Sequence, residues 1–225
     1  MAKKTSRKEL LKSQDEFISF SYRALAFFST RTRELKTAGI VIAAAALIFI
    51  GVSAYYRHVE KKGYEAYNTA YFAMIEHFRP GMEPDRLESV QELFENVLEN
   101  HAGSKAADLA LPQLAFLKFM EEDYDGAIRL YSRFETRASG KDDFMNLNSL
   151  AVAASFEAAG NLNRAIKTLE PVAADPQNRF RETALFTLAR LYRLAGQESR
   201  AAELARDFIE EFRGSPFVPI AKTYL

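Results

Sequence analysis

Hydrophobic and polar positions divide the sequence into three parts. Residues 38–56 contain no Asp, Glu, Lys, Arg, Asn or Gln. As a helix rising about 1.5 Å per residue, this stretch spans roughly 28 Å, close to the hydrocarbon thickness of a bilayer. Residues 57–225 place apolar residues at the three- and four-residue spacing of amphipathic helices, and no strand pattern is present. The pattern predicts an all-α fold, in which a transmembrane helix is followed by a solenoid of α-hairpins.

The apolar stretch is predicted to be an uncleaved membrane anchor. Its large apolar side chains each favour insertion by about 0.3–0.6 kcal/mol, and no charge opposes them. One alternative is a buried helix of a soluble domain, although such helices usually carry a polar face. Another is a signal peptide, because Val52-Ser53-Ala54 has the small-residue form of a cleavage site. The 37 residues before the stretch are long for the start of a signal peptide.

Charge is distributed unevenly on the two sides of the apolar stretch. Residues 1–37 carry nine Lys and Arg against four Asp and Glu, whereas residues 57–225 carry 21 against 26. The positive-inside rule therefore places the basic arm in the cytoplasm. The acidic large domain has no basic stripe for nucleic acid. The sequence has no Cys, which excludes thiol catalysis and disulfides.

The arm itself contains a helix signal. Ser13-Gln14-Asp15-Glu16 has the form of a capping box, with Ser13 as the N-cap. The residues after it combine an aromatic and aliphatic face with Arg23 and Arg31, which predicts an amphipathic helix at the membrane surface. Such a helix either docks onto a membrane partner or rests in the lipid headgroups, and both interpretations stay open.

The large domain repeats one helical hairpin. Segments 108–134, 146–172 and 182–208 align on one another. Small residues occupy two fixed positions in each segment, which are Ala115, Ala153 and Ala189 in the first helix and Ala127, Ala165 and Ala201 in the second. A period of about 34 residues with small residues at fixed places is typical of a tetratricopeptide repeat. Gly160 and Gly196 are predicted to form the tight turns between paired helices.

Further helices are predicted at both ends of these segments. A helix at 57–78, stopped by Arg79-Pro80-Gly81, pairs with one that starts near Pro84, which makes about four hairpins in all. Ser104 and Ser215 each follow an acidic amphipathic helix and are predicted N-caps of the next helix. The last predicted helix, at 216–225, is a short cap over the final hairpin.

A solenoid of this kind offers a concave groove lined by the first helix of each hairpin. Repeat alignment predicts these inward-facing residues: Phe116, Phe119, Met120, Leu150, Glu157, Phe186, Arg190 and Arg193. An apolar patch that includes a flexible Met suits unfolded or extended polypeptide. The alternative is that Phe116, Phe119 and Met120 pack against the helix at 57–78 and expose nothing.

Catalytic and metal-binding motifs are missing from the sequence. The histidines, His58, His77 and His101, have no metal-ligand spacing on one helix face. Neither a phosphate-binding glycine loop nor a nucleophile elbow is present. We therefore predict no enzyme activity, no cofactor, no metal site and no small-molecule substrate.

Taken together, the arm, the span and the repeats resemble the bacterial single-span tetratricopeptide proteins of the ancillary SecYEG translocon subunit family, also called YfgM-like. The resemblance rests on Asp15-Glu16-Phe17-Ile18 in the cytoplasmic segment, the single span, the Tyr- and Ala-rich helix at 64–73 and the hairpins at 85–225. It implies a periplasmic domain held at the inner membrane near the export channel. The implied partners are translocon components, periplasmic chaperones or exported polypeptides.

A structural role is the second interpretation. Residues 94–104 and 208–215 are similar to each other, and both resemble repeats of periplasmic proteins that coordinate envelope assembly or cell division. Such proteins are scaffolds rather than export helpers.

Overall fold

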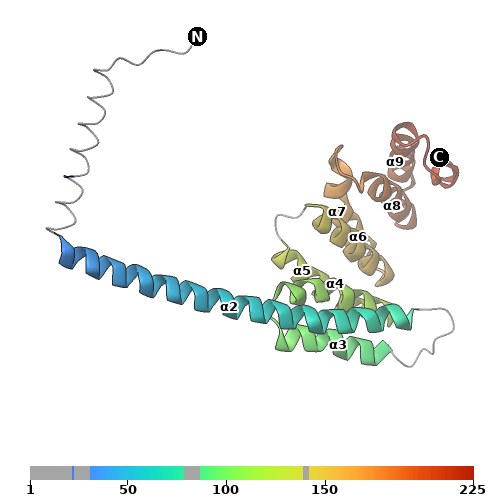
Figure 1. Ribbon diagram of the computed structural model, residues 1–225. Helices are drawn as coiled ribbons and strands as arrows, with labels where there is room; N and C mark the ends of the chain where they lie inside the picture. Colours follow the sequence, from blue (N-terminus) through green and yellow to red (C-terminus); the bar gives the residue numbers. More distant parts are fainter. Residues whose placement is uncertain (1–21, 23–30, 79–86, 139–141) are drawn as a thin grey trace, which may run out of the picture. The chain divides into compact units, whose positions relative to one another are not determined.

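All regular elements of the computed structural model are helices (Figure 1). The structure describes residues 22, 31–78, 87–138 and 142–225, and these contain no strand. The predicted all-α fold is therefore confirmed. The predicted helix start at Ser13, the stop at Arg79-Pro80-Gly81 and the start near Pro84 lie outside the described residues.

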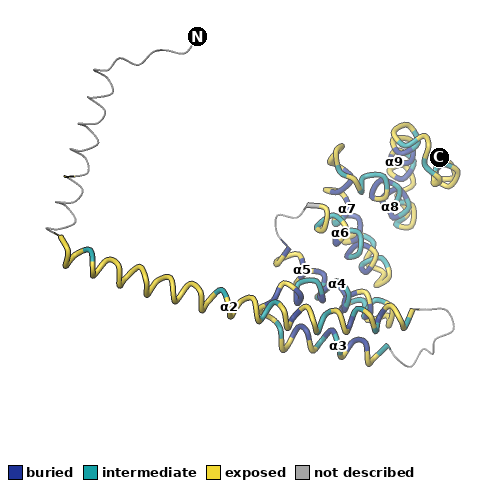
Figure 2. The backbone as a smooth tube through the Cα atoms, in the orientation of Figure 1, coloured by how far each residue is buried: buried dark blue, intermediate teal, exposed yellow. Residues whose placement is uncertain are grey.

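The chain divides into two compact units, residues 1–57 and 58–225. The helix α2 (Thr32–His77) begins in the first unit and ends in the second. Within α2, an 18-residue window has a mean hydropathy of 2.3 and contains no buried residue (Figure 2). By length and composition the helix can cross a membrane. The window therefore contributes no residue to the packed core of this structure.

The second unit consists of helical hairpins that follow one another along the chain (Figure 1). The end of α2 packs on α3 (Leu87–Asn100). Three hairpins follow: α4 (Lys105–Met120) with α5 (Tyr124–Arg137), α6 (Asp142–Ala158) with α7 (Leu162–Ala174), and α8 (Arg181–Leu194) with α9 (Glu198–Glu211). The predicted series of hairpins is thus present in the described part of the chain.

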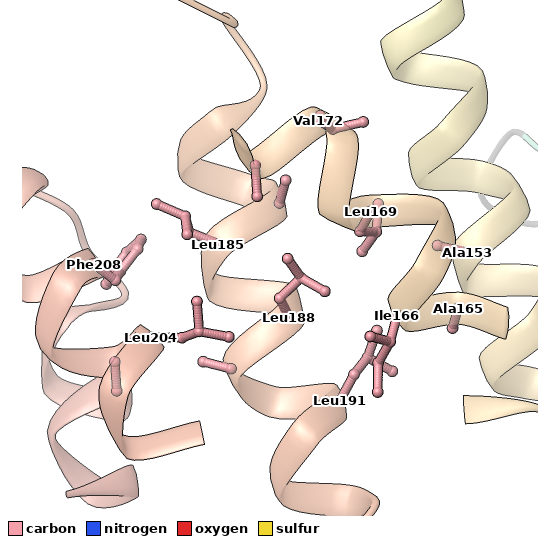
Figure 3. Packing of buried hydrophobic residues seen from close by; sticks show 14 of the residues in the cluster. Ala153, Ala165, Ile166, Leu169, Val172, Leu185, Leu188, Leu191, Leu204 and Phe208 are labelled. Carbon is pink, nitrogen blue, oxygen red and sulfur yellow. The ribbon is translucent and has the colours of Figure 1, made fainter. Parts of the chain in front are cut away.

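Small residues allow the paired helices to approach closely. The six alanines at the predicted crossing positions are each at most 1% exposed: Ala115, Ala127, Ala153, Ala165, Ala189 and Ala201. Leucines beside them fill the space between hairpins, as Leu169 of α7 and Leu188 of α8 do in Figure 3. Because a close-packed interior has no spare room, a larger side chain at an alanine position must displace a neighbouring helix.

The end of α2 joins the repeat core through small residues as well. Gly63 and Ala70 are buried there, and Tyr67 packs edge-on against Phe94 with ring centroids 6.0 Å apart. A Cβ on Gly63 would lie 2.2 Å from the Ser104 Oγ, so α2 passes directly over the start of α4. The Tyr- and Ala-rich segment is therefore part of the repeat core.

Each turn inside a hairpin contains one residue with a positive φ. Gly160 and Gly196 have φ values of 76° and 73°, in the left-handed region that glycine adopts without strain, which confirms their predicted role. Glu122 takes the equivalent place in the first hairpin with φ of 65°. The residue after Glu122 is Asp123, and its side chain caps α5 by accepting from the Gly126 N–H. The residue after Gly160 is Asn161, which caps α7 in the same way by accepting from the Arg164 N–H.

The predictions for the helix caps and the final helix are partly wrong. Ser104 is the N-cap of α4 and accepts from the Ala107 N–H, as predicted. Ser215 is not an N-cap, because α10 (Val218–Ala221) begins at Val218 and its N-cap is Phe217. The Ser215 Oγ accepts from the Phe217 N–H, which lies before the helix. The final segment forms only this short helix and the 3₁₀ turn η2 (Lys222–Tyr224). Pro219 lacks an N–H and stands in the first turn of α10, a place where proline is tolerated.

Enlarging one crossing alanine should destabilise the repeat domain, whereas the same change next to it should not. Ala153 is buried at the crossing of α6 with α7, and its neighbour Ala154 is exposed on the same helix. We expect Ala153→Leu to lower the free energy of unfolding by about 1–3 kcal/mol through overpacking. Ala154→Leu should change it by less than about 0.5 kcal/mol. Urea unfolding of the full chain in detergent measures both, and equal effects would contradict the crossing role.

Candidate functional site

An apolar groove of about 500 Å³ opens between the hairpin α4–α5 and the helix α6. Most of its lining surface is carbon. The lining residues are Tyr67, Leu109, Pro112, Gln113, Tyr131, Phe134, Phe144, Leu147, Asn148, Leu150 and Ala151. Its size lies within the range of protein pockets that bind ligands. It is therefore the strongest candidate for a binding site in the described part of the chain.

One wall of the groove is a stripe along α4. The opposite side of this helix carries Ala106, Ala110 and Leu114, which are buried in the core. Leu109 and Pro112 lie on the other side, at a spacing that places them on a shared face. Because α4 is apolar on both sides, one side fills the core and the other faces the groove.

The facing wall belongs to α6, and its large side chains are exposed. Phe144 is 51% exposed and Leu147 is 53% exposed. Single exposed apolar residues are common, but two of them beside a concave apolar surface indicate a place for a partner.

Equivalent repeat positions form the two walls. The crossing alanines Ala115 and Ala153 are 38 residues apart, and the same spacing joins Leu109 to Leu147 and Pro112 to Leu150. The groove therefore lies between successive first helices, and Tyr67 of α2 and Tyr131 and Phe134 of α5 complete its lining.

Four side chains with polar groups lie among the apolar lining, those of Tyr67, Gln113, Tyr131 and Asn148. Asn148 is 5% exposed, and its Nδ2 donates to the Tyr131 backbone carbonyl at 3.2 Å. Burial raises the pKa of the Tyr131 hydroxyl to about 12, so this group remains neutral at physiological pH. The Asn148 Oδ1 is buried and has no hydrogen-bond partner.

The structure brings one of the eight predicted groove residues, Leu150, into this groove. Phe116 lies against Phe78 with ring centroids 5.7 Å apart and keeps 39% of its surface exposed. The ring of Phe119 packs edge-on against Tyr124 at 5.4 Å, and Met120 is exposed. The contact with α2 follows the alternative interpretation for Phe116, but it leaves part of the ring accessible.

Glu157 and Arg190 are brought together on neighbouring first helices. The guanidinium donates to both carboxylate oxygens of Glu157, with Nη2 to Oε2 at 2.7 Å. These hydrogen bonds raise the pKa of Arg190. Because each charge already has its partner, this pair ties α6 to α8 in the present structure.

The chain's own last segment covers the predicted groove residues of α8. Phe186 stacks on Phe217 at 4.8 Å and on Tyr224 at 6.2 Å between ring centroids. Arg193 donates to the Thr223 carbonyl at 2.6 Å and lies over the Tyr224 ring. These residues are therefore engaged inside the molecule.

The sequence interpretation missed most of the open groove. Phe144, Leu147 and Leu109 were visible only as apolar helix positions, which usually indicate core. Their exposure depends on which helix faces are left uncovered. Among the described residues, no group of three or more His, Asp or Glu side chains is arranged to hold a metal ion.

Replacing Tyr131 should alter stability at high pH. The folded pKa is about 12 and an unfolded tyrosine titrates near 10, so the unfolded chain releases its proton first. The stabilisation is complete below pH about 10 and is lost as the pH rises toward 12. Between pH 9.5 and 11.5 the wild type should lose free energy of unfolding as Tyr131 ionises in the unfolded chain. In Tyr131→Phe this loss should be smaller by about 2 kcal/mol. Urea unfolding at both pH values measures this, and equal falls would contradict burial of the hydroxyl.

Comparison with known proteins supports the helical-repeat fold. Residues 183–215 match the model of the tetratricopeptide repeat family. No curated protein matches the sequence. The structure is similar to a crystal structure of TPR-like repeats from a putative kinesin light chain of Podosopora anserina, with a TM-score of 0.57. The two sequences are 16% identical, and the match covers 74% of this chain and 84% of that chain. It is also similar to the MamA protein, with 14% identity, coverage of 71% and 88%, and a TM-score of 0.51.

At these identities the structural likeness shows the fold alone. The family match covers α8 and α9, where the sequence repeat is also clear. The chain therefore carries a tetratricopeptide repeat at residues 183–215, and its described hairpins have a fold like that of tetratricopeptide-repeat solenoids.

Proposed function

We propose that this chain is a membrane-anchored adapter that binds other proteins through its helical-repeat domain. The observation that carries the proposal is the open apolar groove between α4 and α6 in a repeat fold. Repeat solenoids use extended concave surfaces of this kind for binding. In this role the chain has no catalytic function.

The proposed location is the bacterial inner membrane, with residues 1–37 in the cytoplasm and residues 57–225 in the periplasm. Support comes from the unburied apolar window of α2 and from the basic arm that precedes it. The span is proposed to remain uncleaved, since Val52-Ser53-Ala54 lies inside one continuous helix.

The proposed task is assistance to protein export at the Sec translocon, with transfer of exported chains to periplasmic chaperones. The resemblance to ancillary translocon subunits supports this task. An apolar groove in a membrane-attached domain suits polypeptides that emerge unfolded, because such chains expose the apolar side chains that they bury later.

A structural scaffold for envelope assembly or cell division is the second candidate. One observation favours it: Phe186, Arg190 and Arg193 are all engaged by internal contacts, which gives the last hairpin a closed surface. A rigid spacer needs such a surface, whereas a binding groove does not.

Photo-crosslinking in the native membrane tests the adapter function. A photo-reactive residue replaces Leu147 in the groove wall, and a second variant carries it at Arg133, which is exposed on α5 outside the groove. We expect adducts to translocon components, exported chains or periplasmic chaperones from position 147, at several-fold higher yield than from position 133. Adducts only to division or envelope-assembly proteins would favour the scaffold, and equal yields at the two positions would contradict a binding groove.

A further inference from the structure

The apolar wall that α4 gives to the groove extends further along this helix. Phe116 follows Pro112 by four positions and Met120 follows Phe116 by four, so the three lie on one face. Phe116 is 39% exposed and Met120 is 50% exposed. We call Leu109, Pro112, Phe116 and Met120 the α4 stripe. It begins in the groove and continues, still accessible, to the end of the helix.

Aromatic side chains of α2 border the α4 stripe. Tyr67 lines the groove and stacks on Tyr71, with ring centroids 5.8 Å apart. Phe78 lies against Phe116 with ring centroids 5.7 Å apart and is 44% exposed. The apolar surface therefore has an aromatic edge near both ends of the stripe.

The length of the α4 stripe determines how much of a ligand it can cover. Leu109 and Met120 are 11 positions apart, which is about 16 Å along a helix axis. An extended chain rises about 3.3 Å per residue, so about five residues span this length. Because most of the groove lining is carbon, those residues must be mainly apolar.

Negative charge is concentrated at the Met120 end of the stripe. Glu121 and Glu122 follow Met120 directly, and Glu76 stands in the last turn of α2, two positions before Phe78. Glu76 and Glu122 are exposed. Helices α2 and α4 also end here, and the C-terminus of a helix carries a partial negative charge.

The basic side chain at this end is already shared among other groups. The Lys118 Nζ donates to the Gln91 Oε1 and lies 3.9 Å from the carboxylates of both Glu95 and Glu121. Within the described ranges, Glu76 and Glu122 take part in no ion pair. Their charge is therefore open to a cation from a partner.

The other end of the stripe is more nearly balanced. Asp108, which precedes Leu109, accepts from the Arg137 guanidinium at 2.9 Å. The Glu60 carboxylate accepts from the Lys105 N–H at 3.1 and 3.2 Å. The surface is thus more negative near Met120 than at the start of α4, which gives a ligand a preferred direction.

The same charge disfavours a second copy of the chain as the occupant. Residues 58–78 and 87–138 carry 13 acidic against 7 basic side chains. A second copy would bring the same excess to the contact, and like charges across an interface are unfavourable. A segment that carries Lys or Arg meets no such repulsion.

We propose that the groove and the α4 stripe bind an extended polypeptide segment of about five apolar residues that has Lys or Arg at the end beside Met120. The basic group lies near Glu76 and Glu122, and the apolar residues cover the stripe. This assignment rests on the proposed adapter function and gives it a substrate class and a binding direction.

Peptide binding to the full chain in nanodiscs tests the substrate class. Phosphatidylcholine carries no net charge, so nanodiscs of this lipid do not themselves attract a basic peptide, and empty nanodiscs give the baseline. Two peptides share five apolar residues and end in Lys-Lys or Gln-Gln, and calorimetry gives each Kd. We expect the Lys peptide to bind about two- to five-fold more tightly at low ionic strength, the effect of exposed charge pairs. The preference should disappear near about 1 M salt.

Two matched double variants locate the charge effect. In Glu76→Gln/Glu122→Gln the preference for the Lys peptide should disappear, while the Gln peptide binds as before. Glu92→Gln/Glu99→Gln removes the same charge from exposed positions of α3, a helix that does not line the groove, and should keep the preference. Equal losses in the two variants would overturn the local role of Glu76 and Glu122.

A second pair of variants tests the apolar contact. Met120→Gln should weaken both peptides several-fold, because it places a polar group in the stripe. Leu194→Gln changes a residue of α8 that is 57% exposed and lies outside the groove, and it should leave both Kd values unchanged. Unchanged binding in Met120→Gln would overturn the extension of the site along α4.

The direction of binding can be tested because the chain contains no Cys. A Lys peptide with a chloroacetyl group at its basic end should alkylate Met120→Cys several-fold faster than Leu109→Cys. Free chloroacetamide corrects each rate for the reactivity of its thiol. A reversed ratio would overturn the proposed direction.

The outcomes separate this inference from the adapter function. Equal affinity for the Lys and Gln peptides would overturn the basic substrate class and leave the adapter intact. Failure of both peptides to bind, with no groove-specific crosslinks at position 147, would overturn both proposals. Self-adducts alone at position 147 would assign the groove to a second copy of the chain and overturn the peptide site.

Discussion

Close approach of helices at small residues is the constraint on which the repeat domain depends. With Ala at both crossing positions, the backbones of the two helices in a hairpin come close together. The larger side chains next to these alanines then project to the sides of the crossing. Leu169 of α7 and Leu188 of α8 then fill the space between two hairpins (Figure 3). Gly63 continues the same rule into α2, where even a methyl group would meet Ser104. The stack and its groove both follow from this spacing.

Much of the fold could be predicted because its causes are local and repeat along the chain. The alanine period and the turns at Gly160 and Gly196 identify the hairpins without any knowledge of distant contacts. The first turn was harder to recognise, since Glu122 adopts the left-handed backbone without the usual glycine. At the last helix, Ser215 and Pro219 carried conflicting signals, and the restriction on proline decided where the helix begins.

The candidate site was less predictable because it depends on which faces remain uncovered. Repeat alignment gives Phe186 and Leu150 the same position, and both were predicted to face the groove. Only the folded chain shows that Phe217 and Tyr224 return to cover the first of them. Leu147, by contrast, stays largely exposed. Such differences arise from contacts distant in sequence, which helical periodicity does not report.

The repeats supply an internal comparison that separates packing from function. Where three equivalent positions hold the same kind of residue, packing alone accounts for them, as at the crossing alanines. Where one position departs from the others, the departure needs its own cause. Asn148 departs from Ala110 and Ala184 beside the open part of the solenoid, and its oxygen lacks a donor.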